Sequence, residues 1–207
     1  MNSIEKLTTG FKSFRDGYFK DRKTTYENLV DGGQNPKVAL IACSDSRIDP
    51  ATLLQTDPGD LFVVRNVANL VPPYEREGHY HGTSAALEFA VQHLEVEHLV
   101  ILGHAYCLFD KPTKGAEGNQ FVPPWMSLVQ SAYLRVEGTL PDSSDDVKAR
   151  ICEKSAVLVS LENLMTFPCI RQRVGTGQLR LHGWYVDIRE GSLQVFDPVN
   201  QQFKTVD

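Results

Sequence analysis

Two cysteines and one histidine have the chemistry of metal ligands. Cys43 ends the apolar run VALIAC, and a second apolar run is followed by His104 and, after two further residues, Cys107. Thiolate and imidazole groups suit zinc, and three protein ligands leave the fourth tetrahedral position for water, as in catalytic zinc sites. Spacing alone leaves another interpretation open, because a lone cysteine in a buried strand is usually a small hydrophobic residue.

A carboxylate and a guanidinium group follow Cys43 directly. Asp45 and Arg47 lie two residues apart, immediately after the apolar run. Arg47 could hold Asp45 ionised through bidentate hydrogen bonds, so that Asp45 accepts a hydrogen bond from a metal-bound water. The alternative is an ion pair that only stabilises the end of a strand.

Short apolar runs must position these residues. Residues 38–43, 61–64 and 98–103 read as buried strands, and residues 83–94 (TSAALEFAVQHL) read as a helix between the last two. Strands that alternate with helices predict an α/β fold with a mainly parallel central sheet flanked by helices. The carboxyl ends of parallel strands open into one crevice, so Cys43 and His104 should converge there.

The two ends of the chain have their own patterns. Residues 147–167 predict a long helix that Pro168 stops, and residues 179–188 and 193–196 predict a hairpin at the edge of the sheet. A second helical stretch covers residues 24–29. The opening segment carries the stripe of an amphipathic helix, which we expect to form an arm that docks on another surface; its members are Ile4, Leu7, Phe11, Phe14 and Tyr18.

Composition excludes several classes of function. The 207 residues carry a net charge of -5, which gives no overall basic surface for nucleic acid. We see no secretory signal and no run of roughly 20 apolar residues that would span a membrane, so we expect a cytoplasmic protein with no membrane partner. Four scattered cysteines do not form a disulfide framework. No linker divides the chain, so residues 1–207 are expected to form one domain.

Several motifs together resemble the β-class carbonic anhydrases. Residues 42–47 (ACSDSR) are similar to the first zinc-site motif of that family, and residues 103–107 (GHAYC) are similar to the second. Residues 59–71 (GDLFVVRNVANLV) and 81–88 (HGTSAALE) match the family closely, and residues 160–164 and 181–185 match it weakly. The resemblance covers nearly the whole chain from about residue 35.

The resemblance implies a function. Cys43, His104 and Cys107 would bind one Zn²⁺ per chain, and Asp45 with Arg47 would form the catalytic dyad. The family reaction is attack of zinc-bound hydroxide on carbon dioxide to give bicarbonate. Asp45 sits on the zinc in closed members and on Arg47 in open ones, and the sequence does not decide between them. Residues 1–35 would be a helical arm that joins subunits into a homodimer or a higher homo-oligomer.

The same resemblance implies a substrate pocket. Gln34, Phe62, Val67 and Tyr80 would surround carbon dioxide or bicarbonate, with part of the wall supplied by a neighbouring subunit. Gln34 could donate a hydrogen bond to a substrate oxygen. Phe62 and Val67 would offer the apolar surface that a nonpolar molecule prefers.

The chain departs from the family one residue after Cys107. Members normally continue with two glycines, whereas this chain has Leu108 and Phe109. Glycine lets a backbone approach a ligand closely, so Leu108 should project into the pocket or displace the loop. Two alternatives follow: a hydrolase of carbonyl sulfide or carbon disulfide on the same scaffold, or a zinc-binding member with low or no activity. The dyad argues against the second, because structural zinc sites usually have four protein ligands.

Overall fold

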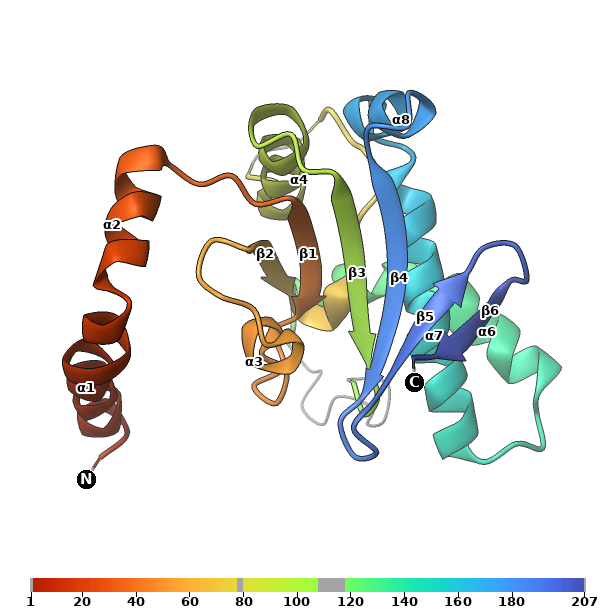
Figure 1. Cartoon of the computed structure of the whole chain (residues 1–207). Helices are drawn as coiled ribbons and strands as arrows, with labels where there is room; N and C mark the ends of the chain where they lie inside the picture. The colour runs from red at the N-terminus through yellow and green to blue at the C-terminus, as the bar shows by residue number, and fades with distance from the viewer. Residues whose placement is uncertain (1, 78–79, 108–117, 207) are drawn as a thin grey trace.

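A mainly parallel sheet forms the centre of the computed structural model, which describes residues 2–77, 80–107 and 118–206. Within this part of the chain the sheet has six strands in the order β2-β1-β3-β4-β5-β6. The first four are parallel and the last two antiparallel, which confirms the predicted α/β class (Figure 1). The strands are β1 Val38–Cys43, β2 Leu61–Asn66, β3 His98–His104, β4 Arg180–Asp187, β5 Ser192–Asp197 and β6 Gln202–Thr205.

Strands β1 and β3 are buried on both faces, as continuous apolar runs require. Each is buried from its second residue to its last. Alternate side chains enter two separate clusters: Ala39 and Ile41 lie in one, and Leu40 and Ala42 lie in the other. The face of Ala39 and Ile41 is covered by α4, α7 and α8 (Figure 1).

The helices lie mainly beside this face of the sheet. The predicted helix over residues 83–94 is observed as α4 Gly82–Glu88, which continues as the π-helical turn η3 Phe89–His93. The long predicted helix is α7 Asp145–Leu164, three residues shorter at its end than expected. Further helices in the described part of the core are α3 Pro50–Leu54, α5 Val122–Met126, α6 Gln130–Thr139 and α8 Pro168–Gly175, with short 3₁₀ turns η2 Val67–Asn69 and η5 Ser127–Val129.

Helix α7 lies close to β3 just before His104. A Cβ atom placed on Gly103 would come within 2.5 Å of Cγ2 of Val157, a residue of α7 with no exposed surface. A side chain at residue 103 would force Val157, the helix or the strand to shift. Gly103 therefore sets the spacing between β3 and α7 beside the candidate ligands.

The N-terminal helices stand away from the sheet (Figure 1). They are α1 Ser3–Phe14, the π-helical turn η1 Arg15–Phe19 and α2 Lys23–Gly32, and none of their residues is buried. Phe14, Phe19 and Tyr26 hold the bend between them, with ring centroids 5.2–6.1 Å apart. A helical arm is thus observed as predicted, and the apolar stripe by which we expect it to dock is largely open to solvent: Ile4, Leu7 and Phe11 are more than 60% exposed.

At the C-terminal end, one prediction needs correction and another is confirmed. Pro168 does not merely stop the preceding helix: α7 ends at Leu164, and Pro168 opens α8, because proline suits the first turn of a helix, where its missing N–H is not needed. The predicted hairpin is present as β4 and β5, but β6 adds a further antiparallel strand at the edge. Among the described helices, none is both long and apolar enough to cross a membrane.

Candidate metal centre

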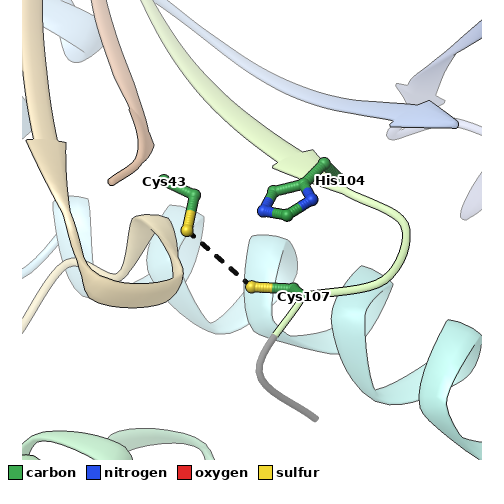
Figure 2. Close-up of side chains that lie close together, drawn as sticks. All are labelled: Cys43, His104 and Cys107. Atoms are coloured by element: carbon green, nitrogen blue, oxygen red, sulfur yellow. Dashed lines mark hydrogen bonds between the residues drawn. The ribbon is translucent and has the colours of Figure 1, made fainter. Parts of the chain in front are cut away.

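Cys43, His104 and Cys107 meet at the carboxyl edge of the parallel strands. Cys43 is the last residue of β1 and His104 is the last of β3, its parallel neighbour. The sulfur atoms of Cys43 and Cys107 are 3.9 Å apart, and the ligand atoms of all three residues lie within 4.8 Å of one another. Figure 2 shows the three side chains facing a common point. All three are buried.

The imidazole of His104 has one nitrogen available to bind a metal. Its Nδ1 lies 2.8 Å from the carbonyl oxygen of Ala105, so Nδ1 carries the proton and donates, and Nε2 keeps its lone pair. The buried Nε2 has no hydrogen-bond partner in the part of the chain that the structure describes. A buried polar atom without a partner is costly. A metal bound jointly with the two sulfurs would satisfy it, so these residues fit a zinc ion.

The environment of Cys43 favours the thiolate. The hydrogen bond with the Cys107 thiol lowers the pKa of Cys43 well below its usual range and outweighs the effect of burial. Backbone N–H groups of Asp45, 3.4 Å from the sulfur, and of Ala68 add to this. The thiolate is the form that binds metal.

Asp45 and Arg47 form the predicted bidentate pair. Arg47 donates from Nε to Oδ1 of Asp45 at 3.0 Å and from Nη2 to Oδ2 at 2.6 Å, and its backbone N–H donates to Oδ1 at 2.9 Å. The side-chain hydrogen bond from Arg47 lowers the pKa of Asp45 to about 2. Nη2 of Arg47 also donates to the carbonyl of Tyr106 at 2.6 Å, so one guanidinium joins the Cys43 loop to the Cys107 loop.

A basic residue behind Cys43 fixes the loop that carries Asp45. Arg65, on β2, donates from Nε to the carbonyl oxygen of Cys43 at 2.9 Å and from Nη2 to the carbonyl oxygens of Asp45 and Ile48. These bonds satisfy three loop carbonyls at once. The position of Asp45 beside the ligands is therefore set from two sides, by Arg47 and by Arg65.

Apolar residues from distant segments surround the two thiols. Trp125 lies in α5 and donates from its indole N–H to the carbonyl of Val67 at 2.7 Å. Sequence reasoning missed Trp125, and the available signal was the Pro-Pro-Trp order in residues 123–125, since proline marks the first turn of a helix. The cluster around Cys43 and Cys107 consists of Val67, Ala68, Leu70, Trp125, Met126, Leu128, Val129, Ala156 and Val159.

Of the residues predicted to line the substrate pocket, Val67 lies in the cluster around Cys43 and Cys107. Gln34 precedes β1, at the opposite end of that strand from Cys43. Phe62 pairs with Ala39 near the start of β1 and packs against Phe89, with ring centroids 5.9 Å apart. Tyr80 is fully exposed. Leu108 lies outside the described residues.

Comparisons with known proteins agree with this architecture. A family model described as carbonic anhydrase matches residues 38–193. Beta carbonic anhydrase 3 of Arabidopsis thaliana is 34% identical over 211 residues, which cover 99% of this chain and 80% of the relative. The carbonic anhydrase of Synechocystis sp. is 35% identical, with 97% of this chain and 73% of the relative covered.

Solved structures extend the agreement to three dimensions. The β-carbonic anhydrase CcaA superimposes with a TM-score of 0.92 at 32% identity, covering 99% of this chain and 100% of that chain. A β-carbonic anhydrase from Sordaria macrospora, described as tetrameric, gives a TM-score of 0.80 at 27% identity over 94% of this chain and 97% of that chain.

The fold and the site define an α/β protein with a Cys-His-Cys group able to hold a metal at the carboxyl edge of a parallel sheet. With the matches above, the chain belongs to the carbonic anhydrase family, in its β class. Members of this family are lyases that catalyse the hydration of carbon dioxide.

Proposed function

We propose that this chain is a zinc enzyme that reversibly converts carbon dioxide and water into bicarbonate. One Zn²⁺ per chain would be held by the sulfurs of Cys43 and Cys107 and by Nε2 of His104. The observation that carries the proposal is the buried Nε2 atom without a described partner, on a histidine whose ligand atom lies within 4.8 Å of two sulfurs. Two thiolates and one imidazole leave a fourth position open, as catalytic zinc requires.

The chain's own residues supply orientation and an apolar surface. When bound, zinc would act as a Lewis acid that makes water acidic enough to lose a proton near neutrality. Asp45, held ionised by Arg47, would accept a hydrogen bond from the attacking water and fix its direction. Val67 and the apolar residues around it would favour nonpolar carbon dioxide beside the ligands.

We propose a homo-oligomer in which residues 1–35 form the dimerisation arm of a single-domain chain. The apolar stripe on α1 is largely exposed in one subunit, and stripes of this kind are normally covered. Gln34 and Phe62 lie toward the amino ends of the strands, whereas the ligands lie at the carboxyl ends. A second subunit would therefore supply Gln34, Phe62 and Tyr80 to the pocket. The four free thiols fit a reducing compartment such as the cytoplasm.

Zinc content and activity should be measured on the same samples of purified chain. We expect about one zinc per chain and rapid carbon dioxide hydration. A chelator should abolish this activity, and added zinc should restore it. The Cys43→Ser variant should lose both metal and activity. As a matched control, Cys169→Ser changes a thiol in α8, away from the ligands, and should retain both.

Hydrolysis of carbonyl sulfide should be followed on the same zinc-loaded samples. Faster turnover of carbonyl sulfide than of carbon dioxide would replace the proposed substrate. Zinc bound in the expected amount with no turnover of either compound would overturn an enzymatic role.

A further inference from the structure

A buried carboxylate on α7 contacts the loop that carries Cys107. Glu153 accepts a hydrogen bond at Oε1 from the backbone N–H of Cys107 at 2.9 Å, and one at Oε2 from the hydroxyl of Tyr185 at 2.6 Å. Arg150, one turn earlier on α7, lies 3.3 Å from Oε1 through its Nη2. The side chain of Glu153 is 1% exposed. Three donors on three different segments thus meet at one buried carboxylate.

Packing alone does not account for this residue. Removing a carboxylate from water is costly unless its partners compensate fully. The buried neighbours of Glu153 on α7 are Ala149, Cys152, Ala156 and Val157, all apolar. Among the described residues, Glu153 is the one carboxylate in the buried class. A leucine or methionine would fill the space without this cost, so the carboxylate needs another explanation.

The group that Glu153 holds is a single peptide unit. The peptide between Tyr106 and Cys107 donates its N–H to Glu153, and its carbonyl accepts from Arg47 at 2.6 Å. An anion on the N–H and a cation on the carbonyl polarise the peptide in the same sense, which strengthens both hydrogen bonds. The plane of this peptide fixes where the Cα of Cys107, and hence its sulfur, lies.

The same loop adopts a conformation that needs support. Tyr106 has φ +62°, in the left-handed region that is unfavourable for a residue with a side chain. Its ring lies between the guanidinium groups of Arg150 and Arg189, whose Cζ atoms are 4.1 and 4.3 Å from the ring centroid. Arg150 therefore contacts both Tyr106 and Glu153. These contacts stabilise the loop in a backbone conformation that Tyr106 by itself disfavours.

We propose that Glu153 is a positioning residue for the zinc site: through the peptide shared by Tyr106 and Cys107, it sets the position of the Cys107 sulfur and ties that ligand to the Asp45–Arg47 pair. The inference rests on the proposed zinc enzyme. It assigns Glu153 no contact with substrate and no proton transfer.

The test compares zinc affinity in the full-length chain and in Glu153→Gln, Glu153→Ala and Tyr185→Phe variants, by competition with a chelator. Loss of a residue that orients a ligand typically weakens metal binding about 10–100-fold, and we expect this for Glu153→Ala. Glu153→Gln keeps an acceptor for the Cys107 N–H and should lose less. Tyr185→Phe leaves the Cys107 contact in place and should give the smallest loss.

A matched control separates positioning from general stability. Leu164→Ala removes a fully buried side chain from the same helix, eleven residues further along and away from the ligands. It should lower the free energy of unfolding of the metal-free chain without changing zinc affinity. As a second readout, the cobalt-substituted protein should show altered thiolate-to-cobalt absorption in the Glu153 variants and an unaltered spectrum in Leu164→Ala.

Two outcomes distinguish failure of the positioning role from failure of the proposed function. If the unmodified chain binds zinc and the folded Glu153 variants bind it equally well with unaltered cobalt spectra, the positioning role is wrong and the zinc enzyme stands. If the unmodified chain binds no zinc, the proposed function itself fails. The Gln and Phe substitutions preserve shape, so the comparison holds even where Glu153→Ala does not fold.

Discussion

Asp45 carries a pH dependence that follows from its pairing with Arg47. The contact lowers the pKa of Asp45 from its ordinary value of 3.8 to about 2. A carboxyl whose pKa is lower in the folded state stabilises the fold above its unfolded pKa, and this stabilisation is lost as the pH falls toward the folded pKa. We expect Asp45→Asn to reduce the stability of the metal-free chain by a constant amount at neutral pH, and by a shrinking amount below a pH of about 4.

Urea denaturation of the metal-free chain and of Asp45→Asn, at pH values between neutrality and 3, measures this difference. The substitution Asp31→Asn is a suitable control, since Asp31 lies on α2 of the arm, away from the ligands. If the difference in free energy of unfolding between the parent chain and Asp45→Asn stays constant down to pH 3, Arg47 does not hold the carboxylate ionised in solution.

At the scale of single residues, the sequence predicted best those site residues whose role follows from their type and their position in the chain. Cys43 and His104 end two apolar runs, so a parallel sheet had to bring them together, and Asp45 and Arg47 are close enough in sequence to pair. Glu153 and Trp125 were missed because their contacts with the site depend on how α7 and α5 pack. That packing joins segments far apart in the chain, and no local pattern encodes it.

Strand β3 and helix α7 are coupled through Gly103. The substitution Gly103→Ala would place a methyl group about where the 2.5 Å contact with Cγ2 of Val157 arises, so we expect it to destabilise the chain by about 1–3 kcal/mol. Val157→Ala removes the clashing atom and leaves a small cavity. The double variant should be more stable than the sum of the two single losses predicts.

A double-mutant cycle in urea supplies the measurement. If the two losses simply add, α7 moves away from β3 at little cost, and Gly103 does not set the spacing. A zinc-affinity measurement on the same variants would show whether that spacing also matters to His104.

Elements with strong local signals were predicted well, and those with weak ones were not. The runs that became β1 and β3 are uniformly apolar because both faces of the sheet are covered. Pro168 was predicted to end the preceding helix. Proline is also common in the first turn of a helix, so the sequence alone is compatible with a helix that begins at Pro168. Strand β6 has four residues, QFKT, and is recognisable only by its pairing with β5.

At the level of the whole molecule, we propose that the arm holds the subunits of a homo-oligomer together. We expect the double substitution of Leu7→Asp and Phe11→Asp to place charges on the exposed apolar stripe and to convert the oligomer to a monomer. Sedimentation velocity would follow the change. Activity should fall with it, because Gln34 would no longer reach a neighbouring site.

Thr9→Asp is the matched control, since it adds a charge to the same helix away from the stripe. It should leave the assembly intact. A doubly substituted chain that remains oligomeric would show that contacts outside the arm hold the subunits together.

The order of the ligands along the chain has a consequence for folding. Cys43 and His104 become neighbours only when β1 pairs with β3, and β2 and α4 lie between them in sequence. Parallel pairing across such a separation is slow, because the loop must close before the contact stabilises it. The nascent chain would therefore present no complete zinc site until the sheet has assembled, and metal that binds only the finished fold would shift the folding equilibrium without guiding the early steps.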